Sequence, residues 1–163
     1  MDEIKKAFFA LDSALKNKDA LRQNASLRAC CKALSKHAYF MPAYKETLDF
    51  KEFYLLSEQD RGKAFRMCLA NHNGKRAYIA CIDQDAYDVW LSRVPHPEQI
   101  GILKGNWKQC FSLYYDGLLQ DFAIDGIVLN PADKGNLFLS PLIIEMVCKF
   151  AKINGTQRMY YDA

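Results

Sequence analysis

Apolar side chains recur at helical spacing through residues 2–36 of the chain. In residues 2–16 they follow the i, i+3, i+4, i+7 rhythm that places one apolar face along a helix. This face consists of Ile4, Ala7, Phe8, Leu11, Ala14 and Leu15. A second helix is predicted for residues 19–36, with Asp19 as a capping residue and Leu27, Cys31 and Leu34 on one side. Because the polar break between the two helices is short, we expect an antiparallel helical hairpin.

From Tyr39 onward the pattern changes to short apolar runs separated by turn residues, which is typical of strands. The predicted strands are residues 39–44, 64–70, 76–82, 100–103, 124–131 and 137–139, and residues 53–56 form a further short strand or a loop. Asn73-Gly74 lies between two of these runs and is the strongest short-range signal of a β-hairpin. The predicted helices are residues 83–93, 106–120 and 140–153, of which the first and last begin with the cap residues Asp83 and Ser140.

This order of elements predicts an α+β fold. We expect a single mixed, partly antiparallel sheet packed by helices, with the N-terminal antiparallel helical hairpin added to it. Residues 1–37 would form the hairpin, as an appendage of the same globule, and residues 38–163 would form the α/β domain. Pro42 places the first strand at a sheet edge or makes it a strand end, because proline cannot donate a hydrogen bond to a neighbouring strand.

Composition narrows the class of protein. Half of the 163 residues are apolar and 13% are aromatic, which excludes a disordered chain. No apolar run approaches the roughly 20 residues of a membrane span. The acidic start Met1-Asp2-Glu3 argues against a secretory signal. We therefore expect a soluble, cytoplasmic protein with no membrane span.

The net charge of +3 is unevenly distributed. Residues 1–37 hold 8 basic and 4 acidic residues, a net charge of +4, and residues 38–163 hold 14 and 15, a net charge of −1. Arg28, Lys32 and Lys36 follow at i, i+4 and i+8 along the second helix. This stripe is either a solvated helix face or a site for an anionic partner such as RNA, an anionic membrane or an acidic protein surface.

Six cysteines are present, at positions 30, 31, 68, 81, 110 and 148. None belongs to a CxxC motif or lies near a histidine at ligand spacing, so we expect no structural zinc, no other metal site and no cofactor. In a reducing compartment all six would be free thiols. Of the adjacent pair Cys30-Cys31, we expect one side chain to face the core and the other not, and a redox-active pair is the alternative.

Catalytic signatures are weak. The available bases are His37, His72 and His96. No GxSxG or comparable motif surrounds a serine or cysteine. Asp83, Asp85 and Asp88 gather near a predicted helix start, where carboxylates favour the positive end of the helix and would serve hydrolysis or metal chemistry only in a cleft. We expect a protein that is not an enzyme, with a small hydrolase or thiol enzyme as an alternative.

Candidate binding residues lie at one strand end and on several helices. Asn130-Pro131 ends a buried strand at a loop, where function is common, although Asn before Pro is also ordinary turn chemistry. Trp90 is a core residue or an interface anchor, since tryptophan is enriched at binding hot spots. The full candidate set is Asn130, Pro131, Trp90, Tyr114, Tyr115, Arg28, Lys32 and Lys36.

Residues 39–150 resemble the SseB N-terminal-domain family in three stretches. The first is the early strand ending in proline, Phe40-Met41-Pro42. The second is the strand at residues 76–82 that leads straight into a capped helix, with an aromatic residue at Trp90. The third is the hydrophobic strand at residues 123–131, which ends in Asn-Pro.

The chain also departs from that family. The strand before the capped helix ends in Cys81-Ile82-Asp83, where the family often has Phe-Thr or Phe-Ser. The basic N-terminal hairpin is not part of the family core, and there is no room for the second domain of longer members. The resemblance implies a small α/β domain of unsettled role, often suspected of protein interaction, and no catalytic residues carry over.

The leading hypothesis is a non-enzymatic protein-interaction module that docks a protein partner. Its contact elements would be the loop at residues 130–136, the helix carrying Tyr114 and Tyr115, and the aromatic tail at residues 160–161. The edge beginning at Tyr39 could accept a strand from the partner. A homodimer is left open, and nucleic-acid or anionic-surface binding through the basic helices is the alternative function.

Overall fold

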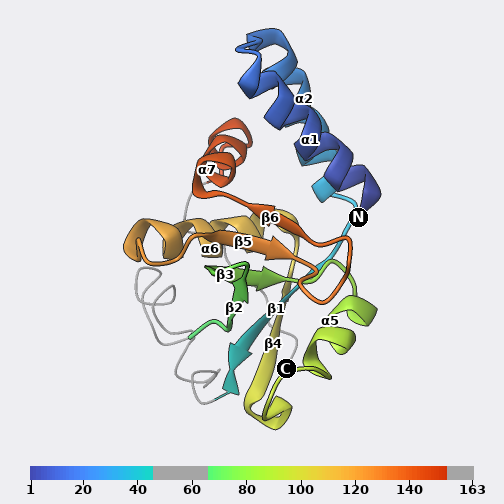
Figure 1. Ribbon diagram of the computed structural model, residues 1–163, viewed down its shortest axis with the longest axis vertical. Helices are drawn as coiled ribbons and strands as arrows, with labels where there is room; N and C mark the ends of the chain where they lie inside the picture. The colour runs from blue at the N-terminus through green and yellow to red at the C-terminus, as the bar shows by residue number, and fades with distance from the viewer. Residues whose placement is uncertain (46–65, 154–163) are drawn as a thin grey trace.

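The computed structural model describes residues 1–45 and 66–153 (Figure 1). The α+β class predicted from the sequence is confirmed. The possible strand at residues 53–56 and the aromatic tail at residues 160–161 lie outside the described residues.

The N-terminal helical hairpin is formed by α1 (Asp2–Lys16) and α2 (Ala20–Leu34), which pack closely along their lengths. Asp19 caps α2 as predicted, because its carboxylate accepts a hydrogen bond from the Arg22 N–H at 3.1 Å. The hairpin interface buries Leu11, Leu27 and Leu34, but Cys30 faces the interior where Cys31 was expected to do so. The hairpin points away from the sheets, and its base lies beside them (Figure 1).

Four strands form a mixed sheet in the order β2 (Leu69–His72), β3 (Lys75–Ala80), β5 (Gly126–Leu129) and β6 (Leu137–Leu139). The central pair β3 and β5 is parallel, and the two outer pairings are antiparallel. The parallel pair needs a long crossover connection, which contains two helices and a further strand.

The remaining strands, β1 (Tyr39–Tyr44) and β4 (Ile100–Gly105), form a separate two-stranded antiparallel sheet. The sequence analysis predicted a single sheet, and this prediction is wrong because β1 and β4 pair with each other outside the four-stranded sheet. Isolated bridges from Phe40 to Cys81 and from Ala43 to Met67 join the two sheets, so β1 runs past the end of β3 rather than along it.

Local sequence signals account for the turns and helix starts. Asn73 and Gly74 connect β2 to β3 with φ values of 51° and 82°, and positive φ at both positions is what a type I′ hairpin turn requires. The later helices are α5 (Gln84–Leu91), α6 (Trp107–Gln120) and α7 (Pro141–Phe150), with a short 3₁₀ turn, η2 (Pro97–Gln99), before β4. Each of the three helices begins with a capping side chain, supplied by Asp83, Asn106 and Ser140.

The mixed sheet is covered on both faces, because alternate residues of a strand point in opposite directions. Ile127 and Leu129 of β5 pack into a cluster with α6, α7 and the hairpin. Val128, between them, packs into a second cluster with Ile79, α5 and the β1–β4 sheet. Both central strands are therefore buried on two sides, which fixes their register.

Gly117 provides a test of the packing between α6 and the sheet. A Cβ at this position would overlap the Tyr78 hydroxyl, and Tyr78 is stacked on Tyr114 with ring centroids 4.5 Å apart. We predict that Gly117→Ala lowers the free energy of unfolding by about 1–3 kcal/mol, measured by urea denaturation, despite the better helix propensity of alanine. Adding Tyr78→Phe, which removes the colliding hydroxyl, should recover part of the loss. Equal or greater stability of Gly117→Ala would contradict this packing, and Gln120→Ala on the exposed side of α6 is the control.

Candidate functional site

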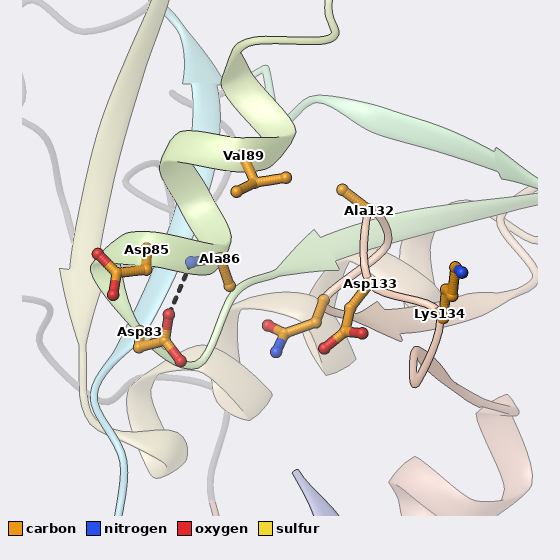
Figure 2. A pocket seen from close by; sticks show the side chains of 8 residues that line it. Asp83, Asp85, Ala86, Val89, Ala132, Asp133 and Lys134 are labelled. Atoms are coloured by element: carbon orange, nitrogen blue, oxygen red, sulfur yellow. Dashed lines mark hydrogen bonds between the residues drawn. The ribbon is translucent and has the colours of Figure 1, made fainter.

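A cavity of about 410 Å³ lies where the parallel strands β3 and β5 end (Figure 2). One wall comes from the first turns of α5, which follows β3, and the other from the loop after β5. The lining residues are Asp83, Asp85, Ala86, Val89, Asn130, Ala132, Asp133 and Lys134. The carboxyl ends of parallel strands are where α/β sheets place ligands. We call this cavity the Asn130 pocket.

Asn130 is the structural link between the two walls. Its backbone N–H donates to Ala80 and its side-chain Oδ1 accepts from the Ile82 N–H, both at 2.9 Å. Its own carbonyl accepts the Asp133 N–H at 2.9 Å, which closes the turn after β5. The residue is 3% exposed and has a φ of 50°, a left-handed conformation that asparagine adopts more readily than most residues.

One polar group of Asn130 has no partner within residues 1–45 and 66–153. The Ile82 N–H is a donor, so the side-chain atom facing it must be the carbonyl oxygen, and the amide nitrogen Nδ2 is the other end. Among the described residues, Nδ2 donates no hydrogen bond. An unsatisfied buried donor costs about 1–3 kcal/mol unless water or a ligand accepts from it. The pocket therefore contains a buried donor in need of an acceptor.

Asp83, Asp85 and Asp133 also line the pocket, and the carboxylate of Asp85 points away from the loop after β5 (Figure 2). Asp83 caps α5 through a 2.6 Å hydrogen bond from the Ala86 N–H (Figure 2), and Asp133 accepts from the Gly135 N–H at 2.9 Å. Within the described part of the chain, none of Asp83, Asp85 and Asp133 forms an ion pair. Lys134 contributes one amine to the lining, so the pocket is acidic.

The apolar part of the pocket is small and lies at its rim. Val89 is 45% exposed and points from α5 toward Ala132, and Ala86 and Ala132 lie on the two walls (Figure 2). Arg93 donates from Nη1 to the carbonyl of Ala132 at 3.1 Å and so ties the loop to the end of α5. These contacts hold the two walls in a fixed relation.

The base of the helical hairpin lies close to the same edge of the sheet. Burial lowers the pKa of His37, the N-terminal amine lowers it further, and the carboxylates of Asp83 and Glu3 oppose both. Lys36 pairs with Glu3 at 2.8 Å. The hairpin therefore brings its own charges to the edge that carries the pocket.

The structure brings two of the three predicted helix-start carboxylates, Asp83 and Asp85, into this pocket. Asp88 does not line it and instead accepts a hydrogen bond from the Gln84 side chain at 2.8 Å. No group of three or more metal-ligating side chains occurs in residues 1–45 and 66–153. Of the three aspartates Asp83, Asp85 and Asp88, it is Asp83 that caps α5, as expected of a carboxylate at a helix start.

Of the other predicted binding residues, the aromatic ones belong mainly to the core. Trp90 is 8% exposed and packs against Tyr87, with ring centroids 6.0 Å apart. Tyr114 is fully buried and donates its hydroxyl hydrogen to the Ile79 carbonyl. Pro131 and Tyr115 are half-buried. Neither Trp90 nor Tyr114 presents a side-chain surface that a partner could contact.

The basic stripe is shorter than the sequence indicated. Arg28 and Lys32 are exposed on α2, and among described residues neither forms an ion pair. Lys36 lies beyond the end of α2 and is held by Glu3. The helix itself contains no acidic residue.

Neither the histidines nor the cysteines line the Asn130 pocket. His72 stacks on Phe138 with ring centroids 5.9 Å apart, and His96 faces Glu98 at 3.3 Å. All six cysteines are free thiols, and the prediction that one of the adjacent pair faces the core is confirmed, with Cys30 buried and Cys31 half-buried. Burial raises the pKa of Cys30 to about 12, which disfavours the nucleophilic thiolate.

No family model, no curated protein and no solved structure matches this chain. The resemblance to the SseB N-terminal-domain family therefore stays a prediction. In the described ranges, no helix has the length and apolar character needed to cross a bilayer.

Sequence reasoning identified Asn130 and the loop after it but missed the acidic pocket they help to form. In the sequence, Asp133 and Lys134 are typical turn residues, and Asp83 and Asp85 are typical of a helix start. No local pattern indicates that these two segments, about 50 residues apart, lie together in the fold. One signal could have indicated this proximity: the apolar runs that form β3 and β5 are separated by helices. Such an order favours parallel strands, and the carboxyl ends of parallel strands meet at one edge of the sheet.

We predict that Asn130→Gly and Asn130→Ala separate the two structural roles of this residue. Both variants lose the bond to Ile82 and should be destabilised by about 1–3 kcal/mol. Alanine should lose about 1–2 kcal/mol more, because it resists the left-handed backbone that glycine accepts. Urea denaturation measures both, with Asn24→Ala on the exposed face of α2 as the control. Equal stability of the two variants would contradict a role for the backbone conformation.

Proposed function

We propose that this protein is a non-enzymatic protein-interaction module that docks a partner at the Asn130 pocket. The observation that carries the proposal is the buried Nδ2 of Asn130, which has no partner among the described residues, in a pocket that is also lined by Asp83, Asp85 and Asp133. A donor and acceptors left unpaired in one cavity form a surface that is complete only when another molecule is bound.

The character of the pocket favours a protein over a small metabolite. Sites for small molecules enclose most of the ligand in apolar walls, whereas the four charged lining residues here are exposed. Val89 gives the rim an exposed apolar edge of the kind that a partner surface covers. None of the lining residues is a histidine, cysteine or serine, so the lining offers no nucleophile paired with a histidine base.

The resemblance of residues 39–150 to the SseB N-terminal-domain family supports the same proposal, because that family is suspected of protein interaction. In this view the α/β body would carry the docking pocket, and the hairpin of residues 1–37 would be an addition peculiar to this chain.

A second candidate function is binding of an anionic partner through α2. Arg28 and Lys32 face solvent on a helix without acidic residues, and Leu21 beside them is also exposed. Two free cations are few for a nucleic acid, since proteins that bind duplex DNA commonly neutralise about 6–10 phosphates. This candidate therefore ranks below the pocket.

The docking proposal is tested with Val89→Lys, which places a tethered amine at the rim of the acidic pocket. The added amine should occupy the carboxylates and block the partner, so a stoichiometric partner recovered with the wild-type chain should be lost or bind at least tenfold more weakly by calorimetry. Leu142→Lys adds the same charge at a 60% exposed position on α7 and is the matched control.

Retention of the partner by Val89→Lys, at wild-type affinity and with an intact fold, would move the docking site away from the pocket. Recovery of no stoichiometric partner by the wild-type chain, together with monomeric behaviour in solution, would refute an interaction module. If the bound species is a second copy of this chain, the partner is the protein itself and the complex is a homodimer.

Binding of an anionic partner by α2 is tested with Arg28→Ala combined with Lys32→Ala. If α2 binds phosphates, this variant should bind a mixed-sequence single-stranded RNA more weakly, and the slope of log affinity against log salt should fall by about 1–2. Lys6→Ala combined with Lys16→Ala removes the same charge from α1 and is the control. Unchanged RNA affinity in the α2 variant would end this candidate.

A further inference from the structure

We infer that the Asn130 pocket receives an arginine side chain of the partner together with a neighbouring main-chain carbonyl. This inference rests on the proposed docking function and adds the chemistry of the group that is bound. It follows from the charge of the lining, the apolar side chains at its rim and the Asn130 donor that has no partner among the described residues.

The charge of the lining selects a cation. The charged lining residues are three aspartates and Lys134, and Arg93 donates to the carbonyl of Ala132 beside them. The second oxygens of Asp83 and Asp133, and both oxygens of Asp85, accept no hydrogen bond within the described residues. The start of α5 contributes about half a positive charge, which is less than one of these carboxylates supplies.

An organic cation fits the pocket better than a metal ion does. No cluster of three or more metal-ligating side chains is present among residues 1–45 and 66–153. A long basic side chain combines a charged head with an apolar stem. The side chains of Ala86, Val89 and Ala132 offer that stem a place to lie, while the head reaches the carboxylates.

The free donor of Asn130 distinguishes a peptide from a free amine. Guanidinium and ammonium groups are donors only, so they satisfy the carboxylates and leave Nδ2 unpaired. A main-chain carbonyl beside the basic residue supplies the missing acceptor. A peptide segment therefore pairs both kinds of group in the pocket, whereas a polyamine pairs one.

Arginine fits better than lysine. Its planar guanidinium presents five donors and can bind two carboxylates at once, while an ammonium acts as a compact point charge that holds its water more tightly. The several unpaired oxygens on Asp83, Asp85 and Asp133 match the larger donor set.

The test is an amide chemical-shift titration of the full chain with the capped tripeptide acetyl-Gly-Arg-Gly-amide. The amide signals of Asp85, Ala86, Asp133 and Lys134 should shift, with lower affinity for the lysine tripeptide and no specific shift for its citrulline counterpart, which is neutral and of similar shape. Higher salt should weaken the arginine response.

Charge-removing variants make the test specific to the pocket. Asp85→Asn combined with Asp133→Asn should weaken the arginine tripeptide at least tenfold, and each asparagine keeps an acceptor oxygen in place. Asp12→Asn combined with Asp88→Asn removes the same net charge elsewhere and should bind like the wild type. An otherwise unchanged spectrum shows that each variant is folded.

The outcomes separate this inference from the function on which it rests. Equal shifts with the arginine and citrulline tripeptides would overturn the cation and indicate a neutral polar ligand. Loss of the partner in Val89→Lys with no response to any tripeptide would keep the docking site and overturn the arginine. A specific arginine response with the partner still bound by Val89→Lys would overturn the link between this site and the partner.

Discussion

The parallel pairing of β3 with β5 is the constraint on which the rest of the structure depends. It brings together segments about 50 residues apart and buries both strands on two faces, with Ile79 and Val128 on one side and Ile127 and Leu129 on the other. Gly126 begins β5 where a Cβ would overlap the carbonyl oxygen of Leu139, so the strand can enter the sheet there only with glycine. Because the two strands run in the same direction, their carboxyl ends meet at one edge. The turn that starts α5 and the loop that follows β5 are then neighbours.

Local chemistry made most of the elements predictable. The Asn73-Gly74 turn, the caps at Asp19, Asp83, Asn106 and Ser140, and the helical spacing of the first two helices each act within a few residues, and each is present in the structure. Strand partners depend on distant residues and were not predictable in the same way. The separation of β1 and β4 from the mixed sheet is one example, and the burial of Cys30 in place of Cys31 is another. In the second case a rotation of about 100° per residue around α2 decides which neighbour faces α1.

Asn130 shows how one residue can be ordinary in the sequence and central in the structure. Turn chemistry before proline is a sufficient reason for asparagine at this position, and the left-handed φ of 50° agrees with it. The structural role uses the backbone and Oδ1, which bind Ala80, Ile82 and Asp133. The amide nitrogen is left over from that role. The proposed binding would use a different atom of the side chain from the structural role, so the turn interpretation and the functional interpretation of the Asn-Pro pair do not compete.

The distribution of charge has a similar explanation in the fold. The hairpin holds the excess of basic residues, yet its base lies near the acidic edge of the sheet, where His37 is affected by Asp83. Lys36 is neutralised there by Glu3, and this pairing holds the pKa of the Glu3 carboxyl below its usual range. The cations that stay unpaired among described residues of α2, Arg28 and Lys32, lie further along the helix. Lys5 of α1 lies next to Gly135 in the loop after β5, yet the carboxylates that line the pocket form no ion pair within the described residues. For the partner proposed above, the carboxylates that line the pocket would attract a basic segment to this edge.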